Sequence, residues 1–140
     1  MLTEKDYCDY DTCVALKELG YKEPSNWWYS SYKDENDKKH IHLIKDHPQS
    51  LTYESWHICP KDFIICPSLY EAQEWLRTKK KLHITVDLSN SDYFWKICKV
   101  GEYEIYFDGT EHSDHDKYES CLADGIKEAI KLLKEESNGN

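Results

Sequence analysis

The sequence predicts an α+β fold, in which an antiparallel sheet of three to five strands is packed by two or three helices in the order α-β-β-α-β-β-β-α. Three observations lead to this prediction. Segments with apolar residues every three or four positions flank segments in which apolar and polar residues alternate. The connections between the alternating segments are short, as they are between antiparallel strands. The 140 residues include 5 Trp, 11 Tyr and 3 Phe, whose large side chains can build a core although only 39% of the residues are hydrophobic.

The first helix is expected to follow Asp9 or Asp11, either of which can cap it. It would end at Gly20, where a left-handed residue is needed. Its apolar face repeats at helical spacing, through Thr12, Ala15, Leu16 and Leu19. Residues 22–39 lose this periodicity, and we expect them to form a loop with a mobile tip at 33–39.

A strand is expected at residues 40–45, before the break at His47-Pro48. A second strand candidate runs from Thr52 to Cys59, where alternate residues would face opposite sides of a sheet. Residues 63–66 are a short apolar run that Pro67 stops.

The second helix has a clear start, because Ser68 and Glu71 have the spacing of a reciprocal capping box. Its basic end, residues 77–81, places positive charge where the helix dipole is negative. Three alternating segments then predict three strands, at 82–88, 93–98 and 103–107. The last helix is expected from Tyr118 to Leu133, where apolar residues keep helical spacing over four turns.

The chain is predicted to be one domain, 1–140, with an N-terminal helix, aromatic loop and hairpin at 1–66, a core at 67–134 and a frayed tail at 135–140. No run of 18 apolar residues could span a membrane, and the opening ten residues do not resemble a secretory signal. We therefore expect a cytoplasmic protein. The formal charge of -9 disfavours general nucleic-acid binding, because a negative protein repels phosphate backbones.

Six cysteines are present, at positions 8, 13, 59, 66, 98 and 121. None forms the C-x-x-C pair of redox motifs and of most structural zinc sites. In a cytoplasmic protein they are expected to be reduced. Cys13, Cys98 and Cys121 lie in periodic segments, where a thiol acts as a small buried hydrophobe. A metal site and crosslinking are the alternatives.

From Ser68 onward, the predicted order of helix, three strands and helix looks like the topology of the double-stranded RNA-binding domain. Those domains begin their final helix with lysines that contact phosphates. The corresponding stretch here, residues 113–117, is acidic. The likeness in topology therefore does not imply RNA binding.

Several motifs resemble those of a group of small proteins from gut Bacteroidales and their phages. They are Leu2–Tyr7 with Ala15–Tyr21, Ser68–Arg77, and Tyr118–Ser120 with Gly125–Ala129. The resemblance spans most of the chain and is weakest over residues 24–60. It implies a cytosolic protein with an accessory, phage-related role, and it carries no functional residue across.

The loop at residues 108–116 packs two histidines and four acids together. His112, Asp114 and His115 are candidate metal ligands, because imidazole with carboxylate suits zinc. The preferred interpretation is a solvated loop before a helix, where acids favour the helix dipole. No metal and no other cofactor is expected.

Side chains for catalysis are available, with His40, His42, His47 and His57 as possible bases and Cys59 and Cys66 as possible nucleophiles. No flanking signature places a thiol beside a base, and no glycine-rich phosphate cradle occurs. We therefore assign no catalytic residue. A small metal-dependent or Cys/His hydrolase is the alternative to a binding protein.

The aromatic loop contains Trp27, Trp28, Tyr29 and Tyr32 among polar neighbours. It is the most informative feature, because no periodic face demands that its rings be buried. One interpretation is that the loop folds back and plugs the sheet. The other is a recognition surface, since Trp and Tyr are favoured anchors for partners and flat ligands. Between Trp27 and Trp28, we expect one ring to be buried and the other to lie exposed at the rim of a cleft.

The candidate binding residues are Trp27, Trp28, Tyr29, Tyr32, Lys39, His40 and His42. Lysines beside aromatic rings could hold an anion. The expected function is that of a non-enzymatic binding protein of phage or mobile-element accessory type. It would engage a protein partner or sequester a small nucleotide-like ligand.

Overall fold

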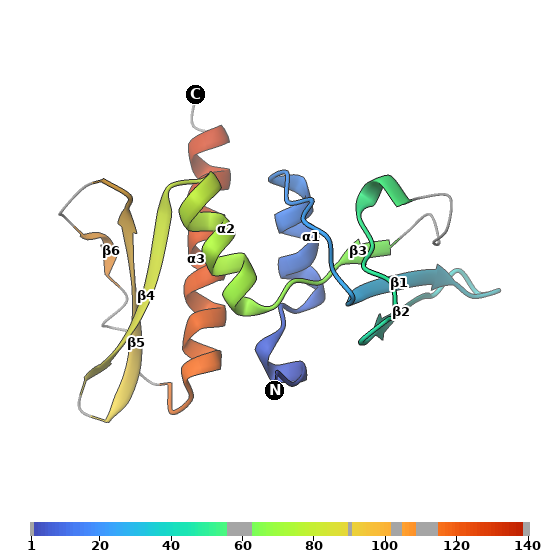
Figure 1. The fold of residues 1–140 in the computed structure, drawn as a ribbon, viewed down its shortest axis with the longest axis horizontal. Coiled ribbons are helices and arrows are strands. Elements are labelled where there is room, and N and C mark those ends of the chain that lie inside the picture. Colours follow the sequence, from blue (N-terminus) through green and yellow to red (C-terminus); the bar gives the residue numbers. More distant parts are fainter. Residues whose placement is uncertain (1, 56–62, 90, 102–104, 109–114, 139–140) are drawn as a thin grey trace. The chain divides into compact units, whose positions relative to one another are not determined.

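The computed structural model describes residues 2–55, 63–89, 91–101, 105–108 and 115–138 (Figure 1). The fold is α+β, as the sequence predicts, but the described strands form two three-stranded antiparallel sheets. Three strands rather than two precede the second helix. Among the helices that the structure describes, none combines the length and the apolar character that crossing a membrane requires.

Residue contacts group the chain into two compact units. The first, which we call the hairpin unit, is Cys8–Pro67. The second, the helical unit, is Met1–Tyr7 together with Ser68–Asn140. Tyr7 and Ser68 form an antiparallel bridge, so the opening segment packs with residues that lie far along the chain.

The hairpin unit contains α1 (Tyr10–Glu18) and a sheet of β1 (Trp28–Lys33), β2 (Lys39–Ile44) and β3 (Phe63–Ile65). The strand order is β2-β1-β3. As predicted, Asp9 caps α1, and its carboxylate accepts a hydrogen bond from the backbone N–H of Thr12 at 2.9 Å. Gly20 follows α1 with a φ of 102°, in the region that glycine adopts most easily.

Two sequence predictions for the hairpin unit are wrong. Residues 28–33 form β1 rather than part of a loop. The prediction missed this strand because Ser, Tyr and Lys follow one another in it without a clear alternation of apolar and polar residues. Tyr53–Ser55 is a 3-10 turn rather than the start of a strand at 52–59, of which residues 56–59 lie outside the described residues. The strand predicted at 40–45 is confirmed as β2.

The helical unit contains α2 (Leu69–Lys79), β4 (Leu82–Ser89), β5 (Asp92–Lys99), β6 (Ile105–Asp108) and α3 (Tyr118–Asn138). The strand order is β4-β5-β6, and α2 and α3 lie on one face of the sheet (Figure 1). The predicted capping box is present. The Ser68 hydroxyl accepts from the backbone N–H of Glu71 at 3.1 Å, and the Glu71 carboxylate accepts from that of Ser68 at 2.9 Å.

The core of the helical unit lies between α3 and the sheet, where Ile84, Ile97, Leu122 and Ile126 are fully buried. A Cβ atom on Gly125 would lie 2.8 Å from Cγ2 of Ile84. The missing side chain therefore lets α3 approach β4 closely. Because α3 continues to Asn138, the frayed tail predicted for 135–140 is wrong for residues 135–138.

Candidate functional site

The hairpin unit has a hollow of about 530 Å³ between α1 and the sheet, which we call the basic hollow. Its lining residues are Tyr10, Lys17, Ser31, Tyr32, Lys33, Lys39 and Ile64. Three of these are lysines and none is an acid, in a chain whose formal charge is -9. A concave surface lined by one sign of charge concentrates its field on a ligand of the opposite sign.

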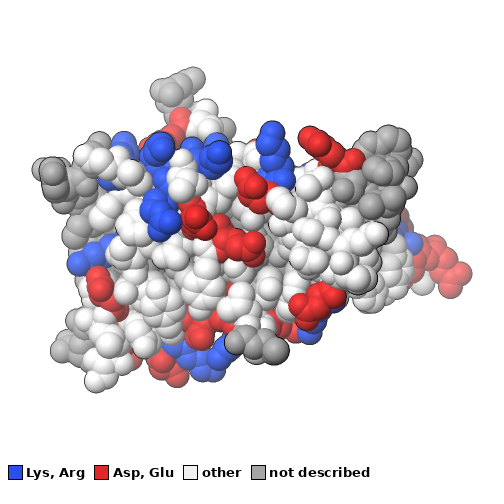
Figure 2. All heavy atoms as spheres, viewed as in Figure 1, with Lys and Arg blue, Asp and Glu red and all other residues white. Residues whose placement is uncertain are grey.

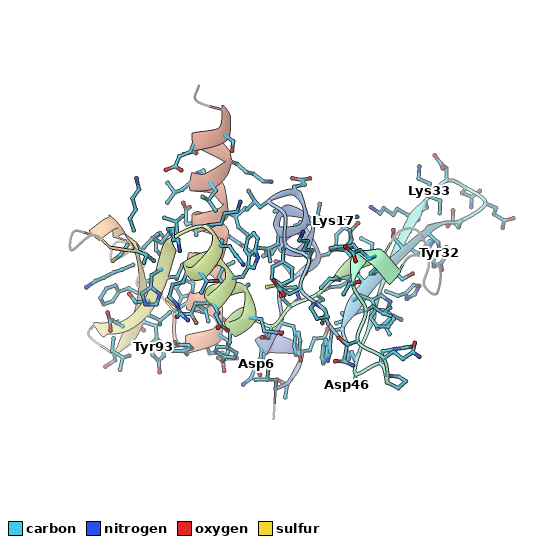
Figure 3. The ribbon with its side chains drawn as sticks, turned by 45° about the horizontal axis from the view of Figure 1, so that its top comes forward. Asp6, Lys17, Tyr32, Lys33, Asp46 and Tyr93 are labelled. Atoms are coloured by element: carbon cyan, nitrogen blue, oxygen red, sulfur yellow. The ribbon has the colours of Figure 1, made fainter. Side chains whose placement is uncertain are left out.

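The strand register brings the hairpin lysines together, because Lys33 of β1 pairs with Lys39 of β2. Side chains alternate along a strand, so Ser31 and Lys33 share one face. Lys17 and Tyr10 are seven residues apart on α1, which places them on the same side of that helix. In Figure 3, Lys17 extends from α1, and Tyr32 and Lys33 lie toward the end of the β1–β2 hairpin.

Two of the lysines have rings as neighbours. The Lys39 ammonium donates to the Tyr10 hydroxyl at 2.9 Å and lies 5.1 Å from the centroid of the same ring. The Lys17 ammonium lies 4.7 Å from the centroid of the Tyr53 ring. Within the described residues, neither ammonium has a carboxylate within ion-pair distance. Lys33 differs, since its ammonium lies 3.6 Å from the exposed Asp37 carboxylate.

The hairpin turn is built around Asp34. Its carboxylate accepts from the backbone N–H groups of Asn36 and Lys38, both at 2.9 Å, and lies 2.8 Å from Nε2 of His40. The hydrogen bond with His40, followed by that from Lys38, holds the pKa of the Asp34 carboxyl below its ordinary value. The turn therefore fixes the start of β2, from which Lys39 reaches the hollow.

Three predicted site residues form a stack at the hairpin. The ring of Tyr32 lies 4.9 Å from that of His40 and 5.5 Å from that of His42, with interplanar angles of 12° and 7°. Tyr32 is 52% exposed. The sequence prediction thus selected side chains that meet, but it had no contact information with which to find Tyr10 and Lys17. The only sign of these two residues in the sequence was their separation of seven positions, which places them on one side of a helix.

Trp27 and Trp28 do not belong to this surface. Each is only 5% exposed, so the expectation that one ring lies exposed at a cleft rim is wrong. The indole N–H of Trp27 donates to Oδ1 of Asp46 at 2.9 Å, and the Trp28 ring lies 4.6 Å from that of His47. Both rings therefore fill the interior of the hairpin unit, and the indole N–H of Trp27 has a hydrogen-bond acceptor there.

Tyr29 is half-buried and acts as a support. Its hydroxyl donates to the carbonyl of Cys8 at 3.3 Å, and its ring meets that of Tyr10 edge-to-face at 5.5 Å. Tyr29 therefore supports Tyr10, which lines the basic hollow, but does not itself line it.

Of the predicted metal ligands, the structure describes only His115. His115 lies 2.9 Å from Asp124 of α3, while His112 and Asp114 lie outside the described residues, as do His57 and Cys59. In the parts of the chain that the structure describes, no group of three or more His, Cys, Asp or Glu side chains is arranged to hold a metal.

Three buried thiols meet in the hairpin unit. The sulfur atoms of Cys66 and Cys13 lie 3.3 Å and 3.7 Å from the carbonyl oxygen of Cys8, and each thiol donates to it. Hydrogen bonding with the Cys66 and Cys8 thiols, together with burial, raises the pKa of the Cys13 thiol. Since the thiolate is the nucleophile, these groups are poorly suited to covalent catalysis.

We expect all six cysteines to titrate as free thiols in the denatured protein, and few of them to react in the native protein. The five described cysteines are free, and all except Cys98 are buried. Ellman titration without reductant, before and after addition of guanidinium, measures both numbers. Fewer than six thiols after denaturation would contradict the prediction of reduced cysteines.

No protein-family model, no curated protein and no solved structure matches the chain.

Proposed function

We propose that this protein binds a small nucleotide-like anion in the basic hollow, without catalysing a reaction. The observation that carries the proposal is that Lys17 and Lys39 have tyrosine rings, rather than carboxylates, beside their ammonium groups. A ring attracts a cation but does not neutralise it. Both ammonium groups can therefore form charge-assisted hydrogen bonds with phosphate oxygens.

The aromatic side chains favour a ligand that also carries a flat ring. Tyr10 lines the same hollow as the lysines, whereas the ring of Tyr32 stacks on those of His40 and His42, on the face of β1 opposite to Ser31 and Lys33. Flat ligand rings stack on tyrosine with offset or edge contacts. The volume of the hollow also falls in the range of about 300–1,000 Å³ that is common for small-molecule sites.

A small ligand is favoured over a protein partner, the other possibility that the sequence left open. Interfaces depend on a few large anchors, most often Trp, Tyr and Arg. The burial of Trp27 and Trp28 removes two such anchors from the surface. The resemblance to Bacteroidales and phage proteins supports an accessory role in the cytoplasm, in which the protein would sequester its ligand.

Calorimetric titration of the full chain with ATP, ADP, AMP and adenosine tests this proposal. We expect affinity to fall as phosphates are removed, because each phosphate adds contacts with the lysines. In the double variant Lys17→Gln/Lys39→Gln, the affinity for ATP should fall about tenfold or more, which corresponds to about 1.4 kcal/mol.

Lys38→Gln is the control for Lys39, because it removes one lysine charge at the neighbouring position but outside the lining of the hollow. Its affinity for ATP should stay within about twofold of the wild-type value. The absence of binding by all four compounds, or equal losses in the double variant and the control, would show that the hollow is not a nucleotide site.

A further inference from the structure

A strand at the edge of a sheet has backbone groups that no neighbouring strand pairs, and two of the edges in this fold are capped by side chains. β3 is one edge of the sheet in the hairpin unit, and the N–H of its Ile65 donates to the Tyr53 hydroxyl at 2.8 Å. β4 is an edge of the sheet in the helical unit, and the carbonyl of its Ile84 accepts from the Gln73 side chain of α2 at 2.8 Å. Covering an edge in this way opposes pairing with a further strand.

β2 is the other edge of the sheet in the hairpin unit. Its outward backbone groups can be identified from the turn, where the N–H of Asp34 donates to the carbonyl of Lys38 at 2.9 Å. Hydrogen-bonded pairs alternate along antiparallel strands, so the groups that point away from β1 are those of Lys39, Ile41 and Leu43. Within the described residues, no side chain bonds to these outward backbone groups.

β2 also lacks the features that commonly prevent pairing at an edge. No proline interrupts its six residues, which pair with β1 in one continuous register. The side chain of Ile41, in the outward-facing series, is 43% exposed. The single lysine of the strand, Lys39, donates to the Tyr10 hydroxyl at 2.9 Å, so its ammonium is directed toward α1. The edge of β2 can therefore accept another strand.

The hairpin is electrically balanced in an acidic protein. Residues 28–47 contain four lysines and four acids, whereas the whole chain has 18 basic and 27 acidic side chains. Figure 2 shows Asp and Glu side chains at several places on the visible face. Two copies of a chain with a formal charge of -9 repel each other least where the facing segments are neutral. The occupant that β2 fits is therefore a second copy of this chain.

We propose that β2 pairs with β2 of a second copy, in an antiparallel register centred on Ile41. A two-fold axis then passes between the two Ile41 residues, and Lys39 lies opposite Leu43 of the second copy. Residues with outward backbone groups thus meet residues with outward backbone groups, and each such pair can exchange both of its N–H···O bonds. No lysine lies directly opposite another lysine, which would be unfavourable.

The side chains on both faces of the strand suit this register. On one face, Ile41 lies opposite Ile41 of the second copy. On the other face, His40 lies opposite His42 of the second copy. The rings of these two histidines stack with that of Tyr32 within each copy, so the pairing brings the two stacks together. Aliphatic and aromatic cross-strand pairs stabilise antiparallel sheets.

Sedimentation equilibrium of the full chain over a range of concentrations tests for the dimer. We expect the mass of the wild type to rise to twice that of the chain, because an isologous interface closes with two copies. Ile41→Lys places like charges directly opposite each other and should weaken the dimer about tenfold or more. Leu88→Lys is the matched control, because Leu88 is a strand residue of the helical unit that is 64% exposed. It should dimerise within about twofold of the wild-type affinity.

Cysteine cross-linking tests the register with variants that add no charge. Directly opposite residues of a hydrogen-bonded pair have Cα atoms about 5.5 Å apart, which suits a disulfide. Treatment with diamide should therefore link Ile41→Cys into a dimer on non-reducing electrophoresis, above the background that the native cysteines give in the wild type. Leu43→Cys is the matched control, because the two Leu43 residues would lie about 13 Å apart along the strands. It should stay at the background.

Three results would each overturn the proposal. The first is a wild-type chain that stays monomeric at every concentration. The second is equal dimerisation of Ile41→Lys and Leu88→Lys. The third is cross-linking of Leu43→Cys as strong as that of Ile41→Cys, which would show that the copies do not meet in this register.

Discussion

Replacing Ile126 with Asp is expected to unfold the helical unit. Ile126 lies on α3 with none of its surface exposed, beside the position where Gly125 allows close contact with Ile84. A carboxylate at this position would lose its hydration without gaining a partner, which costs several kcal/mol. The midpoint of thermal unfolding, followed by far-UV circular dichroism, should fall by roughly ten degrees or more.

Ile126→Val is the matched control, because it keeps the apolar character and removes one methyl group. Its cost should be about 0.5–1.5 kcal/mol, so its midpoint should stay close to that of the wild type. If Ile126→Asp also melts within a degree or two of the wild type, the assignment of this helix face to the core is wrong.

The elements of the helical unit could be predicted because their local signals agree. The capping box of Ser68 and Glu71 sets the start of α2, and strict alternation marks β4 and β5. Leu82 and Ile84 of β4, and Trp95 and Ile97 of β5, both set the periodicity and fill the core. The number of sheets was not predictable, because consecutive strands can join one sheet or two and no local pattern decides between these arrangements.

The strand β1 was missed because its sequence carries little alternation. Only Trp28 of its six residues is fully buried, and Ser30 and Ser31 have no strong preference for either face. Pairing with β2 on one side and β3 on the other makes it the central strand of its sheet. Tertiary pairing therefore overrode a weak local signal.

Part of the candidate site could also be predicted from the sequence. Of the predicted residues, Tyr32 and Lys39 are among those that line the basic hollow, and they lie near one another along the chain. Lys17 joins the site only because α1 packs near β3. A sequence without contact information cannot distinguish the rings that fill a core from those that line a surface, and Trp27 and Trp28 illustrate this.

The burial of these two rings leads to the second large expected effect. Trp27→Ala and Trp28→Ala should each destabilise the hairpin unit by about 3–5 kcal/mol, because each leaves a cavity that the surrounding side chains cannot fill. Trp27→Ala also leaves the Asp46 carboxylate without its indole donor. The expected loss in the midpoint of thermal unfolding is roughly ten degrees or more for each variant.

Tyr32→Ala provides the comparison within the same strand. Tyr32 is 52% exposed, and its contribution is its stacking with His40 and His42, worth about 0.5–1.5 kcal/mol per aromatic pair at most. Its midpoint should therefore fall far less than that of either tryptophan variant. If instead one tryptophan variant keeps the wild-type midpoint, its ring is not part of the core. That indole would then be available to a ligand or a protein partner, and the preference for a small ligand over a protein surface would lose its main support.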